Sequence, residues 1–121
     1  METVLYYEPM TLQNPAILTG LLQRRGLRVV PVDRGQVGQS VGFLAGYQGF
    51  PAQSAAGTPP RDRVLVFCET PEETLDAVLE DLRAPGVPPA LKAILTGANA
   101  AWPFHRLARE LSSEHRMMHG G

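Results

Sequence analysis

Four short apolar runs predict four β-strands in this chain. Residues 4–7 and 64–68 are unbroken apolar runs, a pattern typical of strands buried on both faces. Residues 27–32 and 91–96 have the same strand character over a similar length. We therefore expect two pairs of strands, one in each half of the chain.

Each pair of strands encloses a segment whose apolar residues recur at the spacing of one helical face. Gly26 and Gly86 stand where these two helices should end. Thr70, with Glu73 three residues later, predicts a capping box at the start of the second helix. The residues of the two apolar faces are Ile17, Leu18, Leu21 and Leu22 in the first helix, and Leu75, Val78, Leu79 and Leu82 in the second.

Two further helices and a long loop complete the predicted plan. A turn and a short helix follow the second strand within residues 33–46, and a last helix begins near Asn99. Residues 47–62 are rich in Gly, Pro, Ala and Ser without periodicity, so we expect a loop there. The predicted inward face of the last helix consists of Phe104, Leu107, Ala108 and Leu111.

The two halves of the chain follow the same β-α-β-α plan at an offset of about 60 residues, which predicts an internal duplication. The pseudo-repeats span about residues 3–46 and 63–115, and the loop 47–62 joins them within a single α/β domain, residues 1–121. We predict an α+β fold in which the two units interleave into a four-stranded, antiparallel, ferredoxin-like sheet with extra helices. The alternative is an α/β open sheet, with the units side by side and helices on both faces.

Charge and composition exclude several classes of function. Eleven basic and twelve acidic side chains give a net charge of −1, whereas binding to nucleic acid or to anionic membranes needs a basic excess. No apolar run approaches the roughly 20 residues of a membrane helix, and the N-terminus lacks the pattern of a signal peptide. A single cysteine rules out an intramolecular disulfide. We therefore expect a cytoplasmic protein without nucleic-acid or membrane partners.

Two motifs carry a resemblance to a known family. These are GQSVGFL at residues 38–44 and LKAILTGANAAW at residues 91–102. They resemble a family of small bacterial proteins known as a domain of unknown function, with the best agreement between Val64 and His115. The resemblance implies a bacterial, cytoplasmic origin and a compact domain, and it brings no activity with it.

The turns that follow the second and fourth strands form the candidate ligand site. The first turn is rich in glycine and suits either an anion at a helix N-terminus or close packing of a helix. It matches neither a dinucleotide-binding fingerprint nor a P-loop, so packing is the favoured interpretation. In the second turn, hydrogen bonds to a small polar ligand compete with plain helix capping, which is favoured. The candidate ligand-binding residues are Gly35, Gln36, Gly38, Gln39, Ser40, Thr96, Asn99 and Trp102.

The remaining reactive side chains predict neither a catalytic nor a metal site. Cys68 ends a strand without an evident histidine partner, so we expect it to be a buried apolar residue. His115 and His119 have a chelating spacing but lie in the terminus, and we place His105 on the outer face of the last helix. No cofactor is predicted.

These features predict a non-catalytic binding or regulatory module that recognises a protein or a small ligand and forms a homodimer. The alternative function is a small enzyme with its site at the two turns, residues 35–40 and 96–99, which the interleaved fold would bring together.

Overall fold

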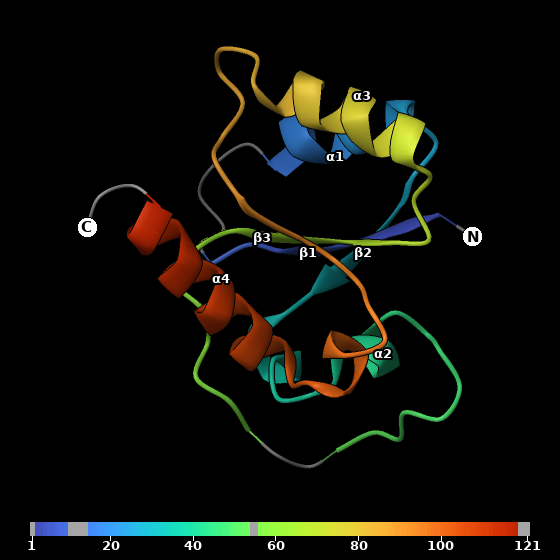
Figure 1. Ribbon diagram of the computed structural model, residues 1–121, viewed down its shortest axis with the longest axis vertical. Coiled ribbons are helices and arrows are strands. Elements are labelled where there is room, and N and C mark those ends of the chain that lie inside the picture. Colours follow the sequence, from blue (N-terminus) through green and yellow to red (C-terminus); the bar gives the residue numbers. More distant parts are fainter. Residues whose placement is uncertain (1, 10–14, 54–55, 119–121) are drawn as a thin grey trace.

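A computed structural model describes residues 2–9, 15–53 and 56–118 of the chain (Figure 1). His119, one of the two histidines with chelating spacing, lies outside the described residues. The elements, in chain order, are β1 (Thr3–Tyr7), α1 (Pro15–Arg24), β2 (Arg28–Val32), the 3-10 turn η1 (Arg34–Gln36), α2 (Val41–Leu44), β3 (Val64–Cys68), α3 (Glu72–Leu82), β4 (Leu91–Ile94), the 3-10 turn η2 (Asn99–Ala101) and α4 (Phe104–Met118).

The four strands form one mixed sheet in the order β2-β1-β3-β4. β1 pairs with β2 in parallel, β3 pairs with β4 in parallel, and the two central strands β1 and β3 are antiparallel. The α+β class with a four-stranded sheet is confirmed, but the strand order is not that of a classic ferredoxin-like sheet. Each unit keeps its own two strands in direct contact, which leaves no position for a strand of the other unit, so the units lie side by side.

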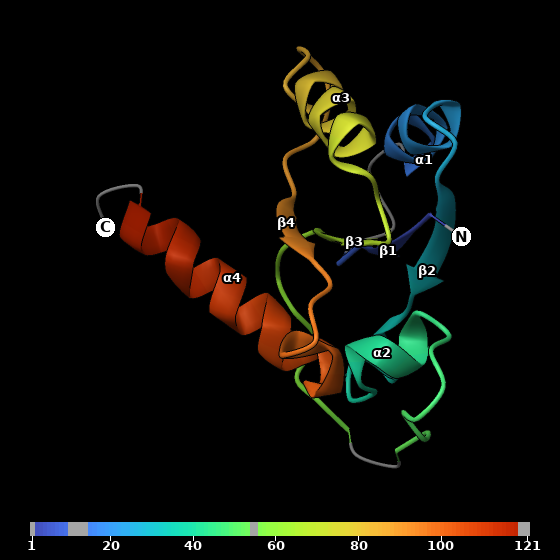
Figure 2. The same ribbon diagram turned by 45° about the vertical axis from the view of Figure 1, so that its right-hand side comes forward.

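Helices cover both faces of the sheet, as the open-sheet alternative expected (Figures 1 and 2). Helices α1 and α3 lie on one face and α2 and α4 on the other. The core on the α1/α3 face contains Val4, Tyr6, Leu18, Leu21, Leu22, Leu27, Leu65, Phe67 and Val78. The core on the α2/α4 face contains Leu5, Tyr7, Val32, Val37, Val41, Val64, Val66, Cys68, Phe104, Leu107 and Ala108.

The position of each strand explains its hydrophobic pattern. Every residue of the central strands β1 and β3 is buried, because both of their faces carry helices. The outer strand β4 alternates between half-buried and exposed residues, and β2 is largely half-buried or exposed. The unbroken apolar runs thus mark the centre of the sheet, and the weaker runs mark its edges.

The helix ends confirm two of the predicted signals and correct two others. Gly26 and Gly86 have φ angles of +83° and +86°, the left-handed conformation that ends a helix and that glycine adopts without strain. The predicted capping box at Thr70 is wrong, because α3 begins at Glu72 and the Thr70 hydroxyl donates to the carbonyl of Cys68 instead. The last α-helix begins at Phe104 rather than near Asn99, and Asn99 is instead the first residue of the short turn η2.

Within the described part of the chain, no helix is both long enough and apolar enough to span a membrane.

Candidate functional site

The two predicted turns meet on the α2/α4 side of the sheet. Ser40 and Pro103 form an isolated antiparallel bridge between them. The amide of Val41 donates to the Trp102 carbonyl at 2.9 Å, and the amide of Phe104 donates to the Gln39 carbonyl at 2.9 Å. The turns therefore pack against each other, as predicted. The prediction assumed interleaved units, whereas the turns meet in a fold whose units lie side by side.

This contact caps the N-termini of both α2 and α4. The amide of His105, the second residue of α4, donates to the Val37 carbonyl at 3.0 Å. The Ser40 hydroxyl, which caps α2, accepts from the amide of Phe43 at 3.1 Å. The amides of Val41, Phe43, Phe104 and His105, which an anion at these helix starts would contact, are therefore bonded within the protein. This geometry supports the packing interpretation of the glycine-rich turn.

The polar side chains of the first turn are bonded within the chain. The Asp33 carboxylate accepts from the amide of Gly35 at 2.8 Å, and the Gln36 side chain accepts from the amide of Asp33 at 3.0 Å, a capping box around η1. The Gln39 side chain pairs with both the amide and the carbonyl of Gln53. Gln39 therefore ties the long loop to the turn.

The second turn is held by a reciprocal pair of hydrogen bonds. The Asn99 carbonyl oxygen accepts from the amide of Thr96 at 2.9 Å, and the Thr96 hydroxyl accepts from the amide of Asn99 at 3.1 Å. The Asn99 amide group also donates to the carbonyl of Ile94 at 3.1 Å. Trp102 is half-buried, and its ring lies 4.2 Å from the guanidinium carbon of Arg106. These contacts agree with a capping role for Asn99 and Thr96.

Two of the glycines have local structural roles. A Cβ atom on Gly42 would lie 2.7 Å from the Phe50 ring, so the absence of a side chain lets Phe50 pack on α2. Gly46 has a φ of +85° just after α2 ends. The small residues of this helix thus accommodate the long loop of the same chain. Gly35 is exposed and Gly38 is buried, and ligand binding by these turn residues stays a prediction.

The remaining reactive groups are buried or covered. Burial, and after it the charge of Glu69, raises the pKa of Cys68 to about 11, and its side chain is buried, as predicted. His105 is not part of the core that contains Phe104 and Leu107, as predicted, but it is half-buried rather than exposed, because the loop residue Gly57 packs against its ring. Among the described residues, no three His, Cys, Asp or Glu side chains gather as a metal site would require.

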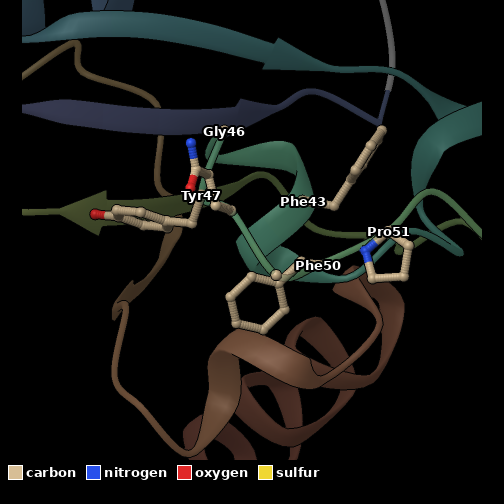
Figure 3. Close-up of a pocket in the computed structure, with 7 residues that line it drawn as sticks. Phe43, Gly46, Tyr47, Phe50 and Pro51 are labelled. Atoms are coloured by element: carbon tan, nitrogen blue, oxygen red, sulfur yellow. The ribbon is translucent and has the colours of Figure 1, made fainter.

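Two open depressions lie elsewhere on the surface. Figure 3 shows the first, about 480 Å³ in volume, whose lining includes Phe43, Tyr47, Phe50 and Pro51. The second, about 540 Å³, lies between α1 and α3. None of the residues that line these depressions belongs to the predicted ligand-binding set. The lining of the second consists of Ile17, Leu21, Arg24, Arg25, Asp81, Ala84 and Val87.

An ion-paired cluster that no sequence pattern predicted lies at the end of β1. The Arg63 guanidinium contacts both oxygens of the Glu8 carboxylate, at 2.8 and 2.6 Å, and both side chains are largely buried. The Tyr6 hydroxyl donates to the same carboxylate at 2.6 Å. Burial and the hydrogen bond to Glu8 raise the pKa of Tyr6. The cluster joins residues far apart in the chain, and no local pattern marks it.

The two outer strands also differ in a way that was not predicted from the sequence. Tyr6 of β1 pairs with Pro31 of β2, and the equivalent Phe67 of β3 pairs with Ile94 of β4. Pro31 and Ile94 therefore occupy matching positions on opposite edges of the sheet. Ile94 is 55% exposed, more than Ile17 at 41%, the other exposed large apolar residue in the described part of the chain. The sequence marks this edge only by Lys92, a charged residue within the apolar run of residues 91–95.

Comparison with known proteins gives one match. No curated protein and no solved structure matches the chain. Residues 63–118, which run from the start of β3 through α4, match a family model described as a domain of unknown function, DUF3783. The motif at residues 38–44 lies outside this segment, whereas the motif at residues 91–102 lies within it. The second half of the chain is thus similar to a domain of unknown function, in agreement with the resemblance that the sequence indicated.

Proposed function

We propose that this protein is a non-catalytic interaction module that binds another protein surface. One observation carries the proposal. The polar side chains of the two turns are used within the chain, while the β4 edge of the sheet presents a large exposed apolar residue, Ile94. An enzyme needs polar groups that are free to contact a substrate, whereas an interaction module needs an exposed surface with unsatisfied bonding capacity.

The state of Cys68 supports the same proposal. A nucleophilic cysteine is exposed and has a lowered pKa, because the thiolate is the reactive form. Cys68 is buried, and its pKa is raised to about 11. Its burial within the core of the α2/α4 face suits a structural role.

A native mass spectrum of the gently purified protein tests this proposal. We expect the 13.1 kDa chain mass or a whole multiple of it, with no additional mass. A discrete added mass would identify a bound small molecule and would contradict the proposal, because it would favour a metabolite-binding or catalytic protein. The matched control is a spectrum recorded after unfolding in acid, which gives the mass of the bare chain.

A further inference from the structure

We infer that the partner bound at the β4 edge is a second copy of this chain, joined strand to strand in antiparallel orientation. The inference rests on the proposed function, because it names the partner of the same interaction module. Three features of β4 support it: the direction of its backbone amides, its charge pattern and the path of α4.

The first feature is the direction of the backbone amides. The amide of Leu91 donates to the carbonyl of Arg63, and the amide of Leu95 donates to that of Phe67. Residues 91, 93 and 95 therefore bond toward β3, and the amides of Lys92 and Ile94 point away from the sheet. No other strand among the described residues lies beyond β4. An outer strand with free N–H groups can pair with another strand.

The opposite edge is closed to such pairing. In β2 the amide of Arg28 donates to the carbonyl of Glu2, so residues 29 and 31 face outward. Residue 31 is proline, which has no N–H group, and proline at this place is a known way to prevent edge pairing. With one edge closed and one open, association stops at two copies and does not continue into a fibre.

The charge pattern of β4 selects one register for a pair of identical strands. If Ala93 lies on the twofold axis, Lys92 of one copy faces Ile94 of the other, and all four outward amides meet carbonyl groups. The Ile94 carbonyl already accepts from the Asn99 side chain, so the amide of Lys92 from the other copy would bond to its second lone pair. Shifting the axis to Lys92 would oppose two like charges. Shifting it to Ile94 would place Lys92 opposite Thr96, whose amide already donates to Asn99. Only the Ala93 register uses every free donor without a charge clash.

The path of α4 adds surface to this contact. Four residues of edge strand alone bury less than the roughly 1,200 Å² of a standard stable interface. Helix α4 packs against β4 and then leaves the body of the molecule on the β4 side (Figure 2). In an antiparallel dimer, each α4 therefore lies alongside the face of the joined sheet. The expected dimer is reversible and depends on protein concentration.

Sedimentation of the full chain over a range of concentrations tests this inference. We expect the wild-type mass to rise from 13.1 kDa toward twice that value. Ile94→Pro, which copies the β2 edge, should raise the dimer dissociation constant about thirtyfold, because each copy loses one hydrogen bond of roughly 1 kcal/mol. Ile94→Lys should weaken the dimer while keeping the backbone donor, and it guards against misfolding of the proline variant. Pro31→Ile should produce species larger than dimers.

Ile17→Lys is the matched control, since Ile17 is 41% exposed but lies on α1. We expect this variant to dimerise like the wild type. The inference is overturned if the wild type stays monomeric at every concentration, or if its dimer is unaffected by both substitutions at Ile94. Such a result leaves the proposed function standing, whereas an added ligand mass in the native spectrum contradicts that function alone.

Discussion

The two halves of this protein share one order of elements, and they differ most at the outer edges of the sheet. Pro31 and Ile94 hold matching positions in β2 and β4, as the pairings with Tyr6 and Phe67 show. Proline removes the outward donor from one edge, and isoleucine leaves both a donor and an apolar side chain on the other. In the dimer that we propose, this single difference restricts association of a nearly symmetric fold to one side.

A second difference separates the two ends of the central strand pair. Continuing the β1–β3 register by one residue places Glu8 opposite Arg63 at one end and Glu2 opposite Glu69 at the other. One end of the β1–β3 pair thus carries an ion pair, whereas the other end places two acidic residues opposite each other.

The largest expected effect is that of Arg63→Ala. The substitution leaves the carboxylate of Glu8, whose side chain is 15% exposed, without its cation, so we expect the free energy of unfolding to fall by about 3 kcal/mol. The measurement is urea denaturation followed by circular dichroism. Arg83→Ala is the matched control, because the Arg83–Glu80 pair is 78% and 76% exposed and should change stability by less than about 0.5 kcal/mol. Equal effects of the two substitutions would contradict the structural role of the Glu8–Arg63 pair.

The next effect compares the two turns. Asn99→Ala removes two side-chain hydrogen bonds to the backbone and should lower the free energy of unfolding by about 2 kcal/mol. Ser40→Ala removes one cap hydrogen bond of α2 and should cost about 1 kcal/mol. Thermal unfolding of both variants measures the difference. If Asn99→Ala left stability unchanged, Asn99 would not be a structural cap, and the turn would again be a candidate ligand site.

The strands and helices could be predicted from local patterns, but the order of the strands in the sheet could not. The apolar runs and the two glycines with positive φ, Gly26 and Gly86, mark strands and helix ends without reference to distant residues. A β-α-β unit, however, has the same local pattern whether its strands are adjacent or separated by another strand. The interleaved prediction therefore differed from the observed strand order although the elements were correct.

The contacts that hold the two turns also could not be predicted, because they join residues that lie far apart in the sequence. Phe50 can pack on Gly42 because this residue has no side chain, and Gln39 is hydrogen-bonded to Gln53. Phe50 and Gln53 both lie in a loop without periodicity, so no local pattern indicates these contacts. The difference between the edges needs the strand register, since only the register shows that Pro31 and Ile94 correspond. The capping of the second turn was the favoured interpretation from sequence, because Asn and Thr are common caps and their partners lie three residues apart.

The most direct test of the account is amide hydrogen exchange in the wild-type protein at low and high concentration. It compares Lys92 with Val29, which hold matching positions and whose amides both point outward from the sheet. We predict that the amides of Lys92 and Ile94 become protected as concentration rises, while that of Val29 exchanges at an unchanged rate. Protection of Val29 alone, or no concentration dependence at Lys92 and Ile94, would contradict the claim that β4 is the interaction edge of this protein.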